Sequence, residues 1–267
     1  MNDDTTSDGS WKFRMIGALA EPTAKRIYTA ADFHEEVNRI RPGTSEVTSR
    51  RVSKALAQAG MLRLVTAGHF LNLRCRPSAQ ISEFAPFIRA GAVVSLQSVL
   101  GECGFLNNLA AITTAVVPSN PLKRPSLGKV KTQAGDLFHF YGLAEKFFPA
   151  TESDRWQLLQ PGRPGDVFRP EPALLHWLYL AGNQRSRLTS PPYDVDMSKL
   201  DGALLSHLAE QWSVSTQLNE WHDAAKASNF GEQSASPVPR TDEQHQEALA
   251  RSQRARDRFI SRMAAKT

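Results

Sequence analysis

The sequence predicts an α+β fold, with an N-terminal winged helix-turn-helix domain at residues 11–77 and a mixed α/β C-terminal domain at residues 78–227. Three helical patterns followed by a hairpin pattern occupy the first segment, in the order typical of a winged helix-turn-helix. Helical and strand patterns alternate along the second segment. Positive charge concentrates in the first segment, whose 12 Lys and Arg against 5 Asp and Glu exceed the net +5 of the whole chain.

The composition is that of a folded protein rather than a disordered one. The chain has 267 residues, of which 41% are hydrophobic and 22% charged. No apolar run reaches the roughly 18–20 residues that cross a bilayer, and the start "MNDDTTSDGS" is too acidic for a secretory signal. We therefore expect a cytoplasmic protein without membrane association. Cys75 and Cys103 fit a reduced compartment, and neither belongs to a CxxC pair of the kind that binds structural zinc.

The two ends of the chain differ from the segments between them. Residues 1–10 are predicted to be a disordered tail, and residues 228–267 to be a linker followed by a basic helix. Arginines recur in that helix at helical spacing, at Arg251, Arg254, Arg258 and Arg262. We favour a solvated tail helix over a second phosphate-binding element there.

Two helices are predicted before the most basic stretch. The first, at residues 11–19, places Trp11, Met15, Ile16 and Leu19 on one face. The second follows Thr29, a good N-cap, and buries Phe33, Val37 and Ile40. Pro42 and Gly43 then interrupt the pattern, as a tight turn between helices would.

The stretch "VTSRRVSKALAQAG" predicts a third helix, with Ser45 or Thr48 as its cap and Gly60 just past its end. At 100° per residue, the predicted buried face consists of Val52, Ala55, Leu56 and Ala59. Arg50 and Lys54 lie opposite that face, with Arg51 and Ser53 on its flanks. In a winged helix-turn-helix this third helix enters the major groove of DNA.

A hairpin is predicted next, with strands around Leu62–Leu64 and Phe70–Leu73 joined by a turn at "TAG". We expect base contacts from Arg50, Ser53 and Lys54, with Arg50 bidentate to guanine. Phosphate contacts are expected from Arg51, Arg63, His69, Arg74 and Arg76. Two alternatives stay open, because basic helix faces are often merely solvated and winged helices also bind proteins.

The C-terminal domain is predicted element by element. Residues 78–90 form a connector, and a helix follows through Leu96, Val99 and Leu100. Strands are expected in "AAITTAVVP" (110–118), "DLFHFYGL" (136–143) and "RWQLLQPG" (155–162), with a loop at "NPLKRPSLGK" (120–129). Two further helices are "RPEPALLHWLYLAG" (169–182), closed by Gly182, and the amphipathic "DMSKLDGALLSHLAEQW" (196–212).

Several of these segments together resemble the AbiEi family. The resemblance rests on "GAVVSLQSVL", "AITTAVVP", "LFHFYGL" and "RPEPALLHWLYL", and covers about residues 12–215. Within it, Ser95 and Leu96 match a Ser-Leu helix, and Pro170–Leu175 matches a Pro-Glu-x-Ala-Leu-Leu segment. Family members often carry an acid after those leucines, where this chain has His176.

Members of the AbiEi family are antitoxins and transcriptional regulators of type IV toxin–antitoxin, abortive-infection loci. The resemblance implies that the N-terminal domain binds inverted repeats in double-stranded DNA of its own promoter, as an autorepressor. It implies that the C-terminal domain counteracts a co-encoded nucleotidyltransferase toxin. Such antitoxins protect without a stable toxin complex, so a tight heterodimer does not follow. The alternative is a protein-interaction module that binds the toxin or another acidic partner directly, without sequence-specific DNA binding.

The sequence predicts no enzyme, cofactor or metal site. Asp194 and Asp196 form a DxD that could hold Mg²⁺, but no Gly-Ser motif precedes it and the segment is predicted to be a loop. His222 and Asp223 form an isolated dipeptide. The sequence has no Walker A, GxGxxG, GxSxG or HExxH motif.

Overall fold

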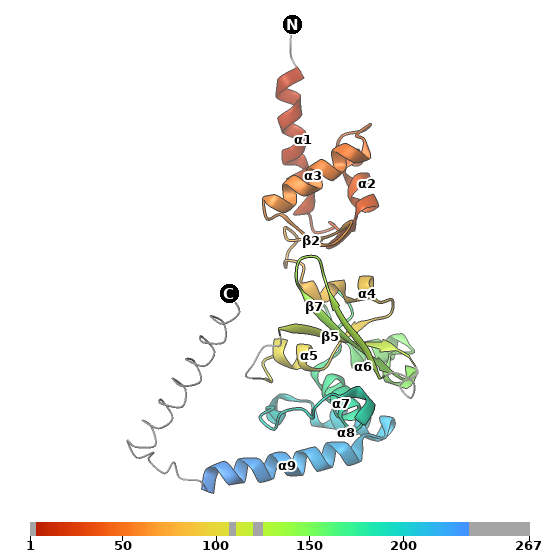
Figure 1. Cartoon of the computed structure of the whole chain (residues 1–267), viewed down its shortest axis with the longest axis vertical. Helices are drawn as coiled ribbons and strands as arrows, with labels where there is room; N and C mark the ends of the chain where they lie inside the picture. The colour runs from red at the N-terminus through yellow and green to blue at the C-terminus, as the bar shows by residue number, and fades with distance from the viewer. Residues whose placement is uncertain (1–3, 107–110, 120–124, 235–267) are drawn as a thin grey trace, which may run out of the picture. The chain divides into compact units, whose positions relative to one another are not determined.

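The computed structural model describes residues 4–106, 111–119 and 125–234, and shows helices with two small sheets (Figure 1). The predicted α+β class is confirmed. The chain divides into two compact units, Met1–Trp221 and His222–Thr267. The boundary predicted after residue 77 therefore falls inside the first unit.

The N-terminal part of the first unit contains three helices and a three-stranded sheet. Its elements are α1 (Asp4–Leu19), β1 (Ile27–Thr29), α2 (Ala30–Ile40), α3 (Glu46–Gln58), β2 (Leu62–Thr66) and β3 (His69–Asn72). The sheet has the order β1-β3-β2 and is antiparallel throughout. Strand β1 was not predicted, because three residues are too short to show an alternating pattern. Residues 4–10 belong to α1, whereas the sequence predicted a disordered tail there.

Local hydrogen bonds explain where α2 and α3 begin. Thr29 caps α2: its side chain accepts from the backbone N–H of Asp32, and the Asp32 carboxylate accepts from that of Thr29. Hydrogen bonds from Lys25 and Thr29 lower the pKa of Asp32 to about 2. Ser45 caps α3, so the first of the two predicted caps is correct. Gly60 follows α3 with a φ of 70°, a conformation that glycine adopts without strain.

The rest of the first unit surrounds a four-stranded sheet. Before and within the sheet come η1 (Ile81–Phe84), α4 (Ala85–Ile88), β4 (Val93–Val94), α5 (Gln97–Glu102), β5 (Ile112–Pro118), β6 (Ser126–Lys131) and β7 (Leu137–Leu143). After it come η2 (Glu145–Phe147), α6 (Glu152–Leu158), α7 (Pro170–Ala181), η3 (Gln184–Ser186), η4 (Met197–Lys199) and α8 (Gly202–Trp212). Helix α9 (Ser215–Ser234) continues into the second unit. The sheet order is β4-β5-β7-β6, with β5 and β7 parallel and the other pairs antiparallel.

The strands at β5 and β7 and the helices at α7 and α8 confirm their predictions, but other segments differ. Residues 81–88, predicted as part of a connector, form η1 and α4. Residues 126–129, predicted as loop, lie in β6 because they pair with β7. Residues 155–158, predicted as strand, end helix α6, which a capping box at Thr151 and Asp154 begins. Residues 228–234, predicted as linker, belong to α9. The predicted basic helix at residues 241–262 lies outside the described residues.

Helix α7 is almost entirely buried, and His176 lies in its middle. The His176 side chain is 0% exposed, and its Nδ1 lies 2.9 Å from the Ser95 hydroxyl. Its ring stacks on Trp212, with centroids 5.1 Å apart. Burial lowers the pKa of His176 to about 3, so the imidazole is neutral at physiological pH. The residue that departs from the AbiEi pattern is therefore a neutral member of the core.

Residues on both sides of position 77 share one hydrophobic cluster. Val65, Leu71 and Cys75 pack in the same core as Phe84 and Phe138. Apolar surface removed from water in such a cluster stabilises the two sides together. The N-terminal part is thus joined to the following residues by packing as well as by chain connectivity.

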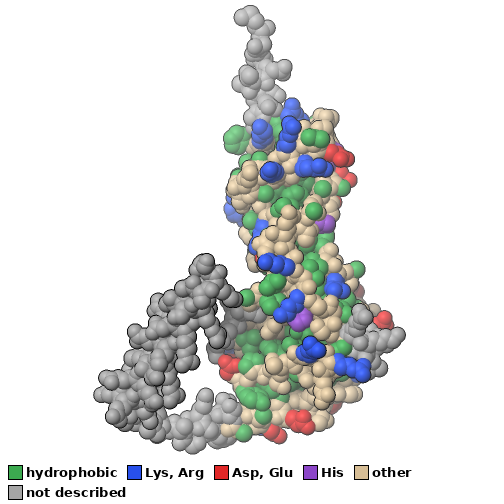
Figure 2. Space-filling model, viewed as in Figure 1, with side chains coloured by type: hydrophobic (Ala, Val, Ile, Leu, Met, Phe, Trp, Pro, Cys, Tyr) green, Lys and Arg blue, Asp and Glu red, His purple; other side chains and the backbone are tan. Residues whose placement is uncertain are grey.

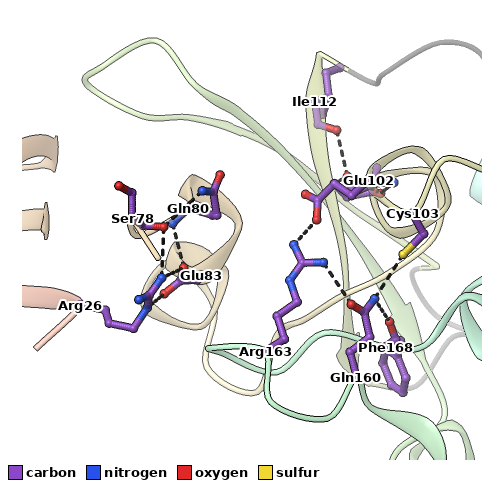
Figure 3. Close-up of polar contacts among 12 residues, drawn as sticks. Arg26, Ser78, Gln80, Glu83, Glu102, Cys103, Ile112, Gln160, Arg163 and Phe168 are labelled. Carbon is purple, nitrogen blue, oxygen red and sulfur yellow. Dashed lines mark hydrogen bonds and ion pairs between the residues drawn. The ribbon is translucent and has the colours of Figure 1, made fainter. Parts of the chain in front are cut away.

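Two ion pairs and a backbone hydrogen bond also cross this junction. Arg26 forms two hydrogen bonds to the Glu83 carboxylate, at 2.6 and 2.7 Å (Figure 3). Arg63 Nη2 lies 2.5 Å from Asp136 Oδ1. The backbone N–H of Gln133, in the turn between β6 and β7, donates to the carbonyl of Val65 in β2. The Arg63–Asp136 and Gln133–Val65 contacts hold β2 against the turn that precedes β7, and the Arg26–Glu83 pair holds the residue before β1 against η1.

Candidate nucleic-acid interface

Helix α3 carries three basic side chains on its exposed face: Arg50, Arg51 and Lys54. Figure 2 shows Lys and Arg side chains gathered over the N-terminal part of the molecule, where Figure 1 places α1 and α3. Among the described residues, none of the three forms an ion pair with an acid. We call Arg50, Arg51 and Lys54 the outward cations.

The buried face of α3 is rotated from its predicted position. Ser49, Ser53 and Leu56 are buried, whereas Ala55 and Ala59 are exposed. Ser53 is 3% exposed and its hydroxyl donates to the carbonyl of Arg50 at 3.0 Å. The Ser53 hydroxyl is therefore not presented to a base, contrary to the position that the sequence predicted for it. The predicted buried face of α3 was wrong because the helical projection at 100° per residue was centred on the alanines and not on the small polar residues.

Polar contacts between α2 and α3 explain this rotation. The Ser49 hydroxyl lies 2.9 Å from His34 Nδ1, and Asn38 Nδ2 lies 2.9 Å from the other ring nitrogen, Nε2. Asn38 Oδ1 also accepts a hydrogen bond from the backbone N–H of Thr44, in the turn between the helices. This run of hydrogen bonds from Ser49 to Thr44 satisfies the buried Ser49 hydroxyl and the half-buried side chains of His34 and Asn38, and it fixes how α3 lies on α2.

Two residues assigned to phosphate contacts are engaged with the junction instead. Arg63, on β2, is held by Asp136. His69, on β3, packs edge-on against Phe84 and Phe87, with ring centroids 5.6 and 6.1 Å away. Both side chains point toward residues that follow position 77. We therefore remove Arg63 and His69 from the set of expected phosphate contacts.

Arg74 and Arg76 are exposed in the segment after β3. The side chain of Asn72 positions this segment, since its Oδ1 accepts from the backbone N–H of Arg74 at 3.0 Å. Asn72 is itself fully buried, and its amide donates to the carbonyls of Leu19 and Lys25. Both arginines are accessible, and their phosphate contacts stay a prediction.

Arg26 is a basic residue that the sequence analysis did not single out. Besides Glu83, its guanidinium donates to the carbonyl of Pro77 and to that of Ser78, which Figure 3 labels. The Glu83 side chain is 7% exposed and also accepts from the backbone N–H of Gln80 at 2.8 Å. No local signal could identify this pair, because its members are 57 residues apart. We call Arg26 and Arg63 the inward cations.

A second polar cluster in Figure 3 lies within the C-terminal part. Arg163 pairs with Glu102 on α5 and also donates to the side chain of Gln160. Gln160 in turn donates to the carbonyl of Phe168 at 2.8 Å. This cluster ties the segment between α6 and α7 to α5.

The surroundings of the residues considered for metal chemistry are as follows in the described structure. Asp196 caps η4, since its carboxylate accepts from both the backbone and the hydroxyl of Ser198. Within the described ranges, no group of three or more His, Cys, Asp or Glu side chains could hold a metal ion. Cys75 and Cys103 are free thiols. No helix in the described part of the chain is both long and apolar enough to span a bilayer.

We compared the chain with known protein families, curated proteins and solved structures. No protein-family model matches the chain, and no curated protein is similar to it. Among solved structures, the chain is similar to the Rv2827c protein from Mycobacterium tuberculosis, with 14% sequence identity and a TM-score of 0.47. The similarity covers 81% of this chain and 77% of that one.

Proposed function

We propose that this protein is a sequence-specific DNA-binding regulator whose N-terminal part is a winged helix-turn-helix. The element order α1-β1-α2-α3-β2-β3, with an antiparallel sheet β1-β3-β2, supports this proposal. In such a domain the third helix lies in the major groove and side chains on its exposed face contact base edges. In this proposal α3 is the helix that enters the groove.

The observation that carries the proposal is the set of outward cations on a rigid helix. Arg50 and Lys54 lie one helical turn apart and are exposed. In the described structure no carboxylate neutralises them. Arg50 has the planar guanidinium that binds guanine bidentately, and Lys54 can reach a base or a phosphate. Arg51, Arg74 and Arg76 are proposed to contact phosphates.

A mobility shift with the DNA upstream of the gene tests the proposal. We expect the double variant Arg50→Ala/Lys54→Ala to lose operator binding, because each base contact contributes on the order of 1–3 kcal/mol. Arg63→Ala is the matched control, since it removes a cation of the same domain that Asp136 already holds. Unchanged affinity of the double variant, with its fold verified by circular dichroism, would contradict the assignment.

The antitoxin activity of the C-terminal part is a proposal that rests on the AbiEi resemblance. We propose that the protein counteracts a nucleotidyltransferase toxin encoded next to it. Co-expression of the two genes should restore growth that the toxin alone prevents. The variant Arg50→Ala/Lys54→Ala should still protect, because those residues lie on the DNA-binding helix. Failure of the intact chain to protect would overturn this proposal.

A second candidate function is a protein-interaction module, and the engaged hairpin favours it. Arg63 and His69 face the C-terminal part, so the hairpin offers DNA fewer cations than expected. Salt dependence separates the two functions, because phosphate contacts make log K fall steeply with log salt concentration. No DNA affinity at low salt, together with co-purification of an acidic partner, would favour the interaction module.

A further inference from the structure

A hollow of about 640 Å³ lies between α2, α3 and the hairpin β2–β3. Its volume is within the range of about 300–1,000 Å³ that is usual for small-molecule sites. The buried rings of Phe33 and Phe70, with centroids 6.1 Å apart, and the side chain of Leu64 give it an apolar base. The outward cations Arg50 and Lys54 line the same hollow.

Small side chains leave this space open. Ala30 and Ala31 on α2 face it from one side, and Ser53 and Ala57 on α3 from the other. At the hairpin tip Gly68 has a φ of 77°, and a Cβ there would lie 3.6 Å from that of Ala30. Protein interiors are otherwise packed at the density of organic crystals. A leucine at any of the alanine positions would occupy part of the hollow.

The rim supplies charge above the apolar base. Arg50 and Lys54 stand one turn apart on α3, and within the described structure neither is in an ion pair. A guanidinium binds a carboxylate through two parallel hydrogen bonds. Glu35 and Glu46 also line the hollow, so an ammonium group on a ligand would find a carboxylate there.

We propose that this hollow binds a small organic carboxylate with an apolar body, the size of an aryl-substituted short-chain acid or an apolar amino acid. The apolar body packs on Phe33 and Phe70, and the carboxylate pairs with Arg50. A bound ligand then occupies side chains that α3 also needs for DNA, so ligand and DNA compete. The binding site stands on the hollow alone, whereas the competition rests on the proposed DNA-binding function.

Calorimetric titration of the full chain without DNA tests the site. The ligands are 3-phenylpropionate, L-phenylalanine and 2-phenylethylamine, which share one aromatic body and differ in charge, with acetate as a carboxylate lacking that body. We expect 3-phenylpropionate to bind and both the amine and acetate to fail. L-phenylalanine differs from 3-phenylpropionate by its ammonium group, so tighter binding of L-phenylalanine would indicate that a carboxylate of the rim, from Glu35 or Glu46, receives that group. Equal binding of the amine, or no binding by either carboxylate, overturns the proposal.

Variants locate the binding in this hollow. Ala57→Leu fills the hollow from α3 and Arg50→Gln removes the carboxylate partner, and each should weaken 3-phenylpropionate at least tenfold. Arg51→Gln is the matched control, because Arg51 lies on the same helix but does not line the hollow. If Ala57→Leu does not fold, Ala31→Leu fills the space from the exposed side of α2. Undiminished binding by a folded cavity-filling variant overturns the site.

Adding 3-phenylpropionate to the complex with upstream DNA completes the test, and release of the DNA is the expected result. Carboxylate binding by a chain that has no DNA affinity would support the site and overturn the proposed function. DNA binding by a chain that binds no carboxylate would support the proposed function and overturn the site. DNA that stays bound at saturating ligand would contradict the competition.

Discussion

The outward cations and the inward cations of the N-terminal part have the same charge but different partners. Arg50, Arg51 and Lys54 are exposed on α3 and form no ion pair among the described residues. Arg26 and Arg63 are held by Glu83 and Asp136 from the C-terminal part. The comparison shows that one basic segment contains side chains that are available to a polyanion and others that already form ion pairs with the C-terminal part. Substitutions should therefore separate DNA affinity from stability.

Glu83→Ala should have the largest effect, and on stability rather than on DNA affinity. Removing one member of a buried pair leaves the other charge uncompensated, which costs about 3–5 kcal/mol. We expect the lower end of that range, because the Arg26 side chain is 23% exposed. Urea denaturation measures the loss. Glu83→Gln, which keeps one oxygen acceptor for Arg26, should be less destabilised. Equal stability of Glu83→Ala and wild type would contradict a stabilising role of the Arg26–Glu83 pair.

Arg50→Lys should weaken specific DNA binding while leaving stability unchanged. The substitution keeps the charge but loses the bidentate geometry, which is worth about 1–3 kcal/mol of discrimination between bases. Fluorescence anisotropy with the operator and with a scrambled duplex of the same length measures this difference. Operator affinity should fall to approach that for the scrambled duplex. An equal loss on both duplexes would assign Arg50 to a phosphate.

Ser53→Ala tests the corrected orientation of α3. Its hydroxyl is buried and bonded to the carbonyl of Arg50, so its removal should cost stability of about 0.5–1.5 kcal/mol. DNA affinity should not change. Thermal unfolding and anisotropy on the same sample give both quantities. Weakened DNA binding at unchanged stability would restore Ser53 as a contact residue.

Arg63 and Arg51 should give the smallest effects, and they should differ in the salt dependence of DNA binding. A double-mutant cycle over Arg63→Ala and Asp136→Ala should give a coupling of about 0.2–1 kcal/mol, since the arginine is 41% exposed. Arg63→Ala should leave the salt dependence of DNA binding as it is. Arg51→Ala should lower the slope of log K against log salt concentration by about 0.9, the value for one phosphate contact. A lower slope in Arg63→Ala would return that residue to the interface.

Much of the fold could be predicted because its signals are local. The Thr29 and Ser45 caps lie within three residues of their partners. The β-branched run at β5 indicates a strand, and the apolar run at α7 indicates a buried helix. Strand β6 could not be predicted, because its residues become a strand through pairing with β7. Strand β1 failed for the same reason, since its three residues depend on β3.

The candidate site was predictable in part. Helical periodicity correctly predicts that Arg50 and Lys54 are exposed, but it does not predict that they border the buried side of α3 and line the hollow. The side of α3 that is buried depends on the contact of Ser49 with His34 of α2, and the pairing of Arg63 depends on Asp136, which lies 73 residues away. Partners so distant in sequence leave no periodic trace. The hollow beneath α3 is likewise defined by small residues from separate elements.

The shared core at the junction has a consequence for how the protein can be divided. A fragment that ends at residue 77 would expose Val65, Leu71 and Cys75 to water and would leave the Arg26 guanidinium without its carboxylate. Such a fragment should aggregate or unfold, even though its elements form a complete sequence of helices and strands. Any transfer of the N-terminal part to another protein would have to include Glu83 and Phe84. The unit that can be transplanted is therefore longer than the unit that would touch DNA.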